Sequence, residues 1–129
     1  MTQNKNKKVI LVVDDDPDYT ELTRTRLEAS GYLVSCAADG NEALKFLDAE
    51  RRPDLIMMDI EMPDQNGLTT LININIRSSQ GTEKIPIIVA TGLQSEKVRD
   101  IVESQKVAGY LKKPFGSEEL VQTVKKIIG

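Results

Sequence analysis

Four aspartates within five residues are the feature of the sequence most suggestive of chemistry. The stretch ILVVDDDPD, residues 10 to 18, runs from apolar residues directly into Asp14, Asp15 and Asp16, and Asp18 follows after Pro17. Two like charges about 4 Å apart repel by roughly 4 kcal/mol near a protein surface. We therefore expect a cation to offset this cluster.

Three further polar residues follow apolar runs elsewhere in the chain. Asp59, Thr91 and Lys113 each stand where a short apolar segment ends. If these segments are parallel strands of one sheet, their carboxyl ends share an edge, and ligands of such sheets bind there. The pattern predicts a polar site at one edge of a sheet.

The elements that must position these residues follow from an alternating pattern. Short apolar runs, typical of buried strands, are separated by longer segments with helix signals, which predicts an α/β fold with a parallel sheet covered on both faces. The stretch LININIRS, residues 71–78, is the weakest helix, because Ile72, Ile74 and Ile76 have strand spacing and asparagine is a poor helix former, but we still expect a helix. The expected strands are 9–13, 32–37, 55–58, 85–90 and 109–111.

Helix boundaries are indicated by residues that cap helix ends. These are an N-cap and proline at Asp16–Pro17, a capping box at Asp39 and Glu42, Ser95 and Ser117 before acidic first turns, and Gly31 after the first helix. Asp16 is therefore expected to cap a helix rather than to bind metal.

The carboxylates favour a hard divalent cation. If the strand order is 2-1-3-4-5, strands one and three are neighbours, and Asp14, Asp15 and Asp59 converge in one crevice. Three carboxylates in an oxygen-rich pocket suit Mg²⁺, which keeps several waters, better than zinc or copper. We expect Mg²⁺ to be the cation that offsets the aspartates.

Composition narrows the class of protein. A chain of 129 residues, 40% hydrophobic, fits one domain, and a net charge of -3 argues against direct nucleic-acid binding. No segment is long and apolar enough to insert into a membrane, so we expect a cytoplasmic protein with a disordered polar tail at residues 1–8. Without histidine, and with Cys36 as the one cysteine, zinc sites and Ser-His or Cys-His catalysis are excluded. We expect Cys36 to be a small buried apolar residue.

Four motifs together resemble the response-regulator receiver domain (CheY-like) of two-component signal transduction. They are ILVVDDDP, PDLIMMDIEMPDQNG, PIIVATG and GYLKKPF, in this order. The resemblance covers residues 9–129 and implies the family's flavodoxin-like (βα)5 three-layer fold with strand order 2-1-3-4-5. It also implies a phosphorelay role as a signalling phosphoacceptor rather than an enzyme with turnover.

The resemblance assigns a role to each residue of the site. Asp59 would accept a phosphoryl group from a phosphohistidine of a sensor histidine kinase or a histidine phosphotransfer protein. Asp15, Asp59 and the backbone carbonyl of Glu61 would bind Mg²⁺, and Asp14 would act through a water. The family tunes dephosphorylation at the position of Glu61.

Two further residues would contact the phosphoryl group, and one would respond to it. By resemblance, the Thr91 hydroxyl and the Lys113 ammonium bind phosphoryl oxygens, and an inward movement of Thr91 lets Tyr110 swing from exposed to buried. The signal would then reach a downstream protein or a fused output domain through the face of helix four, strand five and helix five. Lys112 is expected to be a surface residue, and Lys113–Pro114 matches a position where the family has a cis peptide bond.

The sequence departs from its relatives at two places. Gly92 follows Thr91 where alanine is common, which widens access to the phosphoryl group. Ala108 and Gly109 replace an acidic pair that DNA-binding relatives use in dimerisation. We therefore expect a monomer or a weak, phosphorylation-dependent dimer, either standing alone or as part of a longer chain.

Two other classes share part of the pattern. A haloacid-dehalogenase-type phosphatase has an aspartate pair that Asp14 and Asp16 could supply, but Asp18 stands where that family has threonine or valine. A flavodoxin-like flavin binder shares the architecture, but its phosphate loop is rich in Ser, Thr and Gly, unlike DDDPD. Steady turnover of a small phosphoester would favour the phosphatase, and a yellow colour of the purified protein would favour the flavin binder.

Overall fold

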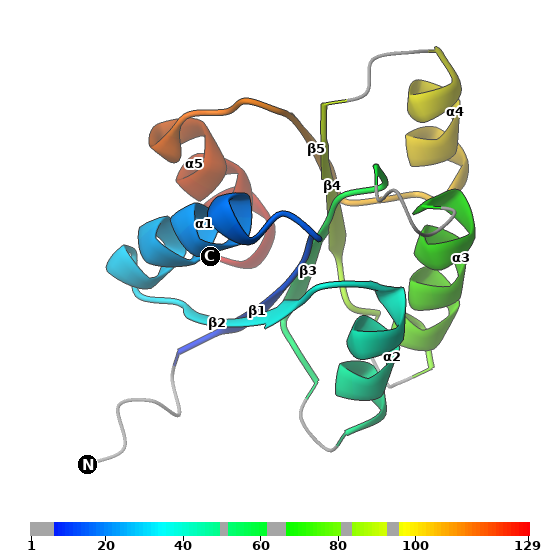
Figure 1. The fold of residues 1–129 in the computed structure, drawn as a ribbon, viewed down its shortest axis with the longest axis horizontal. Helices are drawn as coiled ribbons and strands as arrows, with labels where there is room; N and C mark the ends of the chain where they lie inside the picture. Colours follow the sequence, from blue (N-terminus) through cyan, green and yellow to red (C-terminus); the bar gives the residue numbers. More distant parts are fainter. Residues whose placement is uncertain (1–6, 50–51, 62–66, 81–83, 93–95) are drawn as a thin grey trace.

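A five-stranded parallel sheet forms the centre of the molecule (Figure 1). The computed structural model describes residues 7–49, 52–61, 67–80, 84–92 and 96–129. The strand order is β2-β1-β3-β4-β5, as expected. The strands are β1 (Val9–Val13), β2 (Leu33–Ala37), β3 (Leu55–Met58), β4 (Ile87–Thr91) and β5 (Gly109–Lys112).

Five helices cover the two faces of this sheet and complete three layers. Figure 1 shows α1 and α5 on one face and α2, α3 and α4 on the other. The helices are α1 (Pro17–Ala29), α2 (Gly40–Asp48), α3 (Gly67–Ser78), α4 (Glu96–Ser104) and α5 (Ser117–Ile128). The predicted α/β class and flavodoxin-like architecture are confirmed.

The strands are apolar throughout because both faces of the sheet are buried. Along β1, Leu11 and Val13 pack on the side of α2 and α3, while Ile10 and Val12 pack with Leu27 of α1 on the other side. This alternation gives two apolar cores on opposite faces of one sheet. Strand ends are therefore the places where polar side chains can reach solvent.

The capping residues set the helix boundaries largely as predicted. Asp16 Oδ1 accepts hydrogen bonds from the backbone N–H groups of Asp18 and Tyr19, at 3.0 and 3.3 Å. Asp39 Oδ1 accepts from the Glu42 N–H at 2.8 Å, while the Glu42 carboxylate accepts from the backbone N–H of Ala38. Both predicted caps are confirmed, and Asp16 has the capping role expected of it.

The end of α1 explains why β2 begins one residue later than expected. Gly31 has a φ of 99° and donates to the Glu28 carbonyl, and Tyr32 donates to the Leu27 carbonyl. This is a Schellman motif, in which glycine is favoured because φ is positive. Tyr32 belongs to the helix cap, so β2 starts at Leu33.

Four other expected boundaries differ from the structure: both ends of β4, the end of β5 at Lys112 rather than Leu111, and the cap of α5. β4 starts at Ile87 because Ile85 donates to the Ser78 carbonyl and Pro86 has no N–H, and it continues through Thr91. Ser117 lies inside α5, whose N-cap is Gly116 with no side-chain hydrogen bond. Ser95 is outside the described residues.

The outer elements test three more expectations. Residues 67–78 are helical despite the isoleucine spacing, with Leu71 and Ile74 buried and Ile76 exposed. Cys36 is only half-buried, and its Sγ accepts a hydrogen bond from Arg24 at 3.1 Å, so it is not a purely apolar core residue. Residues 1–6 of the expected tail are outside the described residues, and Lys8 already pairs with β2 through Leu33.

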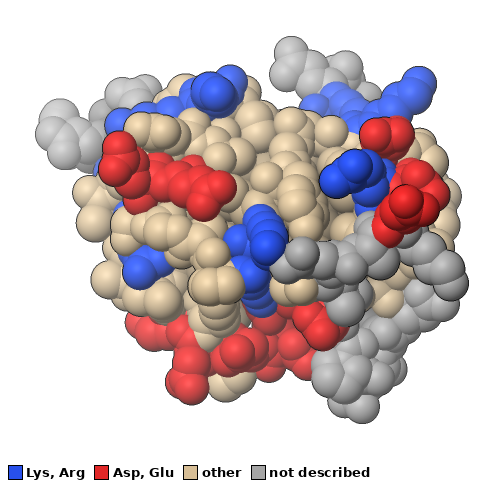
Figure 2. Space-filling view, turned by 90° about the horizontal axis from the view of Figure 1, so that it is seen from above, with Lys and Arg blue, Asp and Glu red and all other residues tan. Residues whose placement is uncertain are grey.

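Two surface observations complete the fold. None of the helices in the described ranges is long and apolar enough to cross a membrane. On the face in Figure 2, acidic side chains form a band along the lower edge and smaller groups at the upper left and the right, while Lys and Arg side chains are dispersed among other residues.

Candidate functional site

Backbone hydrogen bonds beyond the strand ends place the polar residues of the site. The Asp14 N–H donates to the Ala37 carbonyl, the Asp59 N–H to Val13, and the Lys113 N–H to Thr91, at 3.1, 3.0 and 2.9 Å. These bonds continue the sheet by one residue after β1, β3 and β5. The backbone of the first residue after each of these three strands is therefore held by the hydrogen bonds of the sheet.

Lys113 joins the two buried aspartates. Its Nζ lies 2.6 Å from Asp14 Oδ2 and 2.8 Å from Asp59 Oδ2. Asp14 and Asp59 are only 7% and 5% exposed. Part of the repulsion expected from the sequence is therefore offset by an ammonium group of the chain itself, which we did not anticipate.

The environment of Lys113 keeps it charged. Burial alone favours the neutral amine, but the hydrogen bonds and charges of Asp14 and Asp59 outweigh it, so the pKa of Lys113 is raised above its ordinary value. An ammonium that remains protonated in this partly buried position is a fixed positive charge at the edge of the sheet.

Backbone N–H groups bind the remaining oxygens of both aspartates. Asp59 Oδ1 accepts from the Glu61 N–H at 2.8 Å, and Asp14 Oδ1 accepts from the Asp16 N–H at 3.0 Å. Each carboxylate is thus held at both oxygens, which fixes its orientation.

Asp15 differs from its neighbours because its side chain is exposed. Asp14 and Asp59 converge on Lys113, but the described residues contain no group of three or more acidic or cysteine side chains gathered around one point. The donor set nevertheless suits a divalent cation. The ammonium of Lys113 offsets only one of the two buried carboxylates of Asp14 and Asp59, and the exposed Asp15, next to Asp14 in the chain, adds another carboxylate. Oxygen donors of this kind are what Mg²⁺ prefers.

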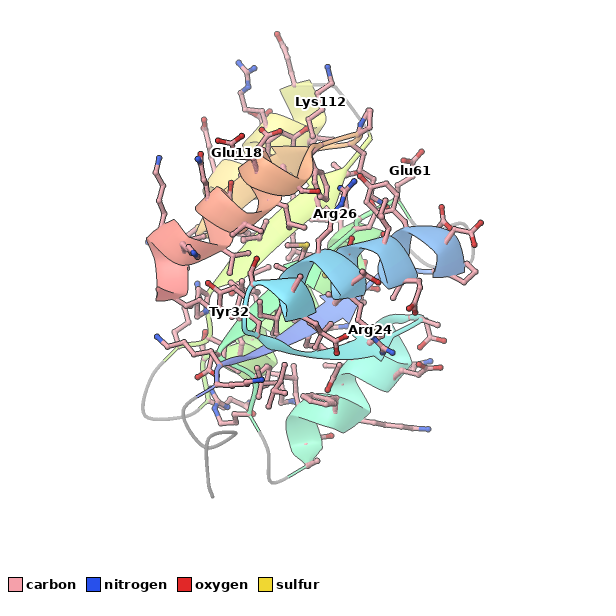
Figure 3. The ribbon with its side chains drawn as sticks, turned by 90° about the vertical axis from the view of Figure 1, so that its left-hand side faces the viewer. Arg24, Arg26, Tyr32, Glu61, Lys112 and Glu118 are labelled. Atoms are coloured by element: carbon pink, nitrogen blue, oxygen red, sulfur yellow. The ribbon has the colours of Figure 1, made fainter. Side chains whose placement is uncertain are left out.

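The other predicted site residues lie on β4, β5 and the segment after β3. Thr91, the last residue of β4, is fully buried, and Tyr110 on β5 is 39% exposed. Lys112 pairs in register with Thr91 and is exposed, as expected. Figure 3 shows the exposed side chains of Lys112 and Glu61 at the periphery of the ribbon. Lys113–Pro114 is a cis peptide bond.

The family model for the response regulator receiver domain matches residues 10–125. The chain belongs to this family. Receiver domains are the phospho-accepting signalling switches of two-component systems, and the match does not favour the phosphatase or the flavin binder.

Curated relatives and solved structures agree with this assignment. The chain is 37% identical over 119 residues to the transcriptional regulatory protein CpxR of Escherichia coli K12, covering 92% of this chain and 48% of CpxR. It is 36% identical over 126 residues to the sensor kinase/phosphatase CqsS of Vibrio cholerae, covering 96% of this chain and 18% of CqsS. The receiver domain thus spans about half the length of CpxR and less of CqsS.

Two solved structures share the fold closely. Chemotaxis protein CheY4 of Vibrio cholerae superposes with a TM-score of 0.84 at 29% identity, covering 95% of this chain and 99% of that chain. A response regulator from Burkholderia pseudomallei, solved with a phosphorylated aspartic acid and a calcium ion, has a TM-score of 0.79 at 26% identity, covering 91% of this chain and 66% of that chain.

Two contacts in this receiver domain were missed from the sequence. The ring of Tyr19 lies beside the Lys113 ammonium, and a Cβ at Gly67 would overlap the carbonyl oxygen of Ile60. Gly67 begins α3, so only a residue without a side chain lets this helix start against the segment that follows Asp59. Gly67, which ends the motif PDLIMMDIEMPDQNG, was the available signal for the second contact.

Proposed function

We propose that Asp59 accepts a phosphoryl group from a phosphohistidine of a sensor histidine kinase or a histidine phosphotransfer protein. A carboxylate oxygen of Asp59 attacks phosphorus, the phosphorus–nitrogen bond breaks, and its electron pair returns to the imidazole of the donor. The observation that carries this proposal is the fixed position of Asp59, bound by Lys113 at one oxygen and by the Glu61 N–H at the other. Phosphoryl transfer depends mainly on such positioning and on charge neutralisation.

Lys113 supplies charge neutralisation where it is needed. Its Nζ is 2.8 Å from Asp59 Oδ2, close to where the oxygens of a phosphoryl group on that carboxylate would lie. We propose that the ammonium then exchanges its bond to Asp59 for a charge-assisted bond to a phosphoryl oxygen. The Thr91 hydroxyl donates to another of these oxygens.

Asp15, Asp59 and the Glu61 carbonyl would hold Mg²⁺, with Asp14 acting through a water. When bound, the ion would neutralise charge on the transferring group. The negative charge that Lys113 leaves uncompensated between Asp14 and Asp59 supports this assignment. The phosphorylated aspartic acid and calcium ion of the Burkholderia relative are consistent with it.

We propose that Thr91 and Tyr110 transmit the phosphorylated state. Thr91 is buried and Tyr110 is 39% exposed, so a movement of Thr91 toward the phosphoryl group would vacate space for the tyrosine ring. The readout surface is the face of α4, β5 and α5, which recognises a downstream protein or a fused output domain. A groove lined by Val98, Val102 and Tyr110 lies on this face.

The remaining assignments concern how the domain acts in the cell. We propose a cytoplasmic switch that is monomeric or weakly dimeric when phosphorylated. It promotes its own phosphorylation and dephosphorylation but has no separate substrate to turn over.

Replacement of Asp59 by asparagine tests the acceptor. We expect wild-type protein with Mg²⁺ and acetyl phosphate to gain one phosphoryl group by intact mass, and Asp59→Asn to gain none while its circular dichroism spectrum is unchanged. Asp16→Asn is the matched control, because asparagine also caps helices, and it should be phosphorylated normally. Label retained in Asp59→Asn would show that another residue is the acceptor.

A further inference from the structure

Tyr19 gives Lys113 a neighbour that the proposed chemistry does not use. Nζ of Lys113 lies 4.2 Å from the centroid of the Tyr19 ring, within the range of a cation–π interaction. Tyr19 is on the first turn of α1, and Lys113 directly follows β5. The contact therefore joins a helix to a strand end at opposite ends of the sequence.

Tyr19 is placed by contacts of its backbone and of its ring. The backbone N–H of Tyr19 donates to the capping carboxylate of Asp16 at 3.3 Å, which fixes the start of the helix. The ring also meets the buried ring of Phe115 edge to face, with centroids 5.5 Å apart and planes at 74°. The ring beside Lys113 is thus packed against a core residue on an anchored first turn rather than extended into solvent.

The ring complements the hydrogen bonds of the ammonium group. A lysine ammonium has three N–H donors, and two of them are satisfied by Asp14 and Asp59. The Tyr19 ring lies against the same ammonium, where it excludes water and adds attraction for the positive charge. Such contacts are strongest where the cation is shielded from solvent, and the Lys113 side chain is 15% exposed.

We propose that Tyr19 is a positioning residue for phosphoryl transfer, acting through Lys113. The ring holds the ammonium at the point where Asp14 and Asp59 meet and keeps it there when the phosphoryl group arrives. This inference rests on the proposed function of Asp59. It predicts that an aromatic ring at position 19 matters, while the tyrosine hydroxyl does not.

A double-mutant cycle tests this role. The variants are Tyr19→Phe, Tyr19→Leu, Lys113→Met and the double variant Tyr19→Leu/Lys113→Met, all in the full chain. The measured quantity is the rate constant of phosphorylation by acetyl phosphate with Mg²⁺, followed by intact mass. We expect Tyr19→Phe to remain within about twofold of wild type, and Tyr19→Leu to be slower by about threefold to tenfold, the size of one cation–π contact.

Lys113→Met separates positioning from packing. Leucine at position 19 keeps an apolar side chain against Phe115. If Tyr19→Leu acted only by weakening packing, it would slow phosphorylation equally in the chain with Lys113 and in the Lys113→Met chain. If Tyr19 acts through the ammonium, Tyr19→Leu should cause no further loss once Lys113 is methionine. Ring-current shifts of the Lys113 ε-methylene protons report the contact independently of activity, and we expect them in wild type and Tyr19→Phe but not in Tyr19→Leu.

Distinct outcomes would overturn the inference. Equal slowing by Tyr19→Leu in both Lys113 backgrounds, or no slowing in either, would overturn the positioning role while leaving Asp59 as the acceptor. A wild-type chain that takes up no phosphoryl group would overturn the proposed function, and this role with it.

Discussion

Two ion-paired regions of this receiver domain differ in almost every physical respect. At the carboxyl edge of the sheet, Lys113 bridges Asp14 and Asp59, with side chains that are 15%, 7% and 6% exposed. On the outer face of the helices, Arg77 pairs with Asp48, whose side chains are 35% and 58% exposed. The first region holds two acids against one base, while the second has equal numbers.

The comparison shows how location decides what an ion pair is for. A surface pair such as Arg77–Asp48 contributes little, because water already solvates both charges. Charged side chains in a buried cluster lose the free energy of solvation by water. The attraction between them offsets this loss only when every charged partner is present. The cluster of Lys113, Asp14 and Asp59 has surplus negative charge, so it is not expected to stabilise the fold. Its charge instead suits a site that binds a cation.

Lys113→Met should give the largest change in the free energy of unfolding. Removing the ammonium leaves Asp14 and Asp59 close together and buried, and breaking a buried ion pair in this way costs about 3 to 5 kcal/mol. Urea unfolding at neutral pH with EDTA measures the loss. Adding Asp14→Asn and Asp59→Asn to the same chain should restore most of it, and a failure to do so would mean that lost packing rather than exposed charge is responsible.

Tyr32→Phe extends the comparison to a buried polar group without a partner. Among the described residues, no group accepts or donates a hydrogen bond to the Tyr32 hydroxyl, and burial raises the pKa of Tyr32. Replacing it by phenylalanine should stabilise the fold by about 1 kcal/mol. Urea unfolding at neutral pH measures this gain. An unchanged or lower free energy of unfolding would mean that the Tyr32 hydroxyl makes a hydrogen bond in the folded protein.

The same residue gives a pH dependence with a defined sign. Because the folded-state pKa is raised, the stability linked to Tyr32 is fully present below the unfolded value of about 10 and is lost as pH rises through the folded-state pKa. The difference in stability between Tyr32→Phe and wild type should therefore grow above about pH 10. A constant difference would contradict the raised pKa.

Asp15→Asn should have a smaller effect on stability and a clear effect on metal response. Because Asp15 is exposed, removing its charge should raise the metal-free free energy of unfolding by less than about 1 kcal/mol. Saturating Mg²⁺ should stabilise wild type by binding the native state, and this gain should be much reduced in the variant. Asp16→Asn, whose side chain still caps α1, should keep the full response to Mg²⁺.

The surface pair should give the smallest effect. Arg77→Ala, Asp48→Ala and the double variant form a cycle whose coupling energy we expect to be about 0.5 kcal/mol or less, and lower still at high salt. A coupling energy as large as the loss expected for Lys113→Met, about 3 to 5 kcal/mol, would contradict the distinction between the two regions.

Local signals in the sequence were sufficient to predict most of the strands and helix ends. Alternating apolar runs predicted the parallel sheet, and Asp16, Asp39 and Gly31 marked helix ends, because each acts on backbone groups within a few residues. Ser117 failed as a cap because Gly116, one residue earlier, occupies that position. The strand order came from the family resemblance rather than from the residues.

The site was harder to predict because its contacts are long-range. Asp14, Asp59 and Lys113 were identified from their places after apolar runs, but the sequence suggested only Mg²⁺ as the balancing cation. That Lys113 reaches both carboxylates depends on side-chain directions at the ends of β1, β3 and β5. The ring of Tyr19 was missed for the same reason, since an aromatic residue on the first turn of a helix has no local feature that predicts a lysine 94 residues later.

The close approach of Gly67 to the Ile60 carbonyl has a consequence for substitutions at the start of α3. Because residues 60 and 67 meet backbone to backbone, any side chain at position 67 would push the first turn of α3 away from the residue that follows Asp59. Even alanine at position 67 should therefore displace the acceptor aspartate, although that position takes no part in the chemistry.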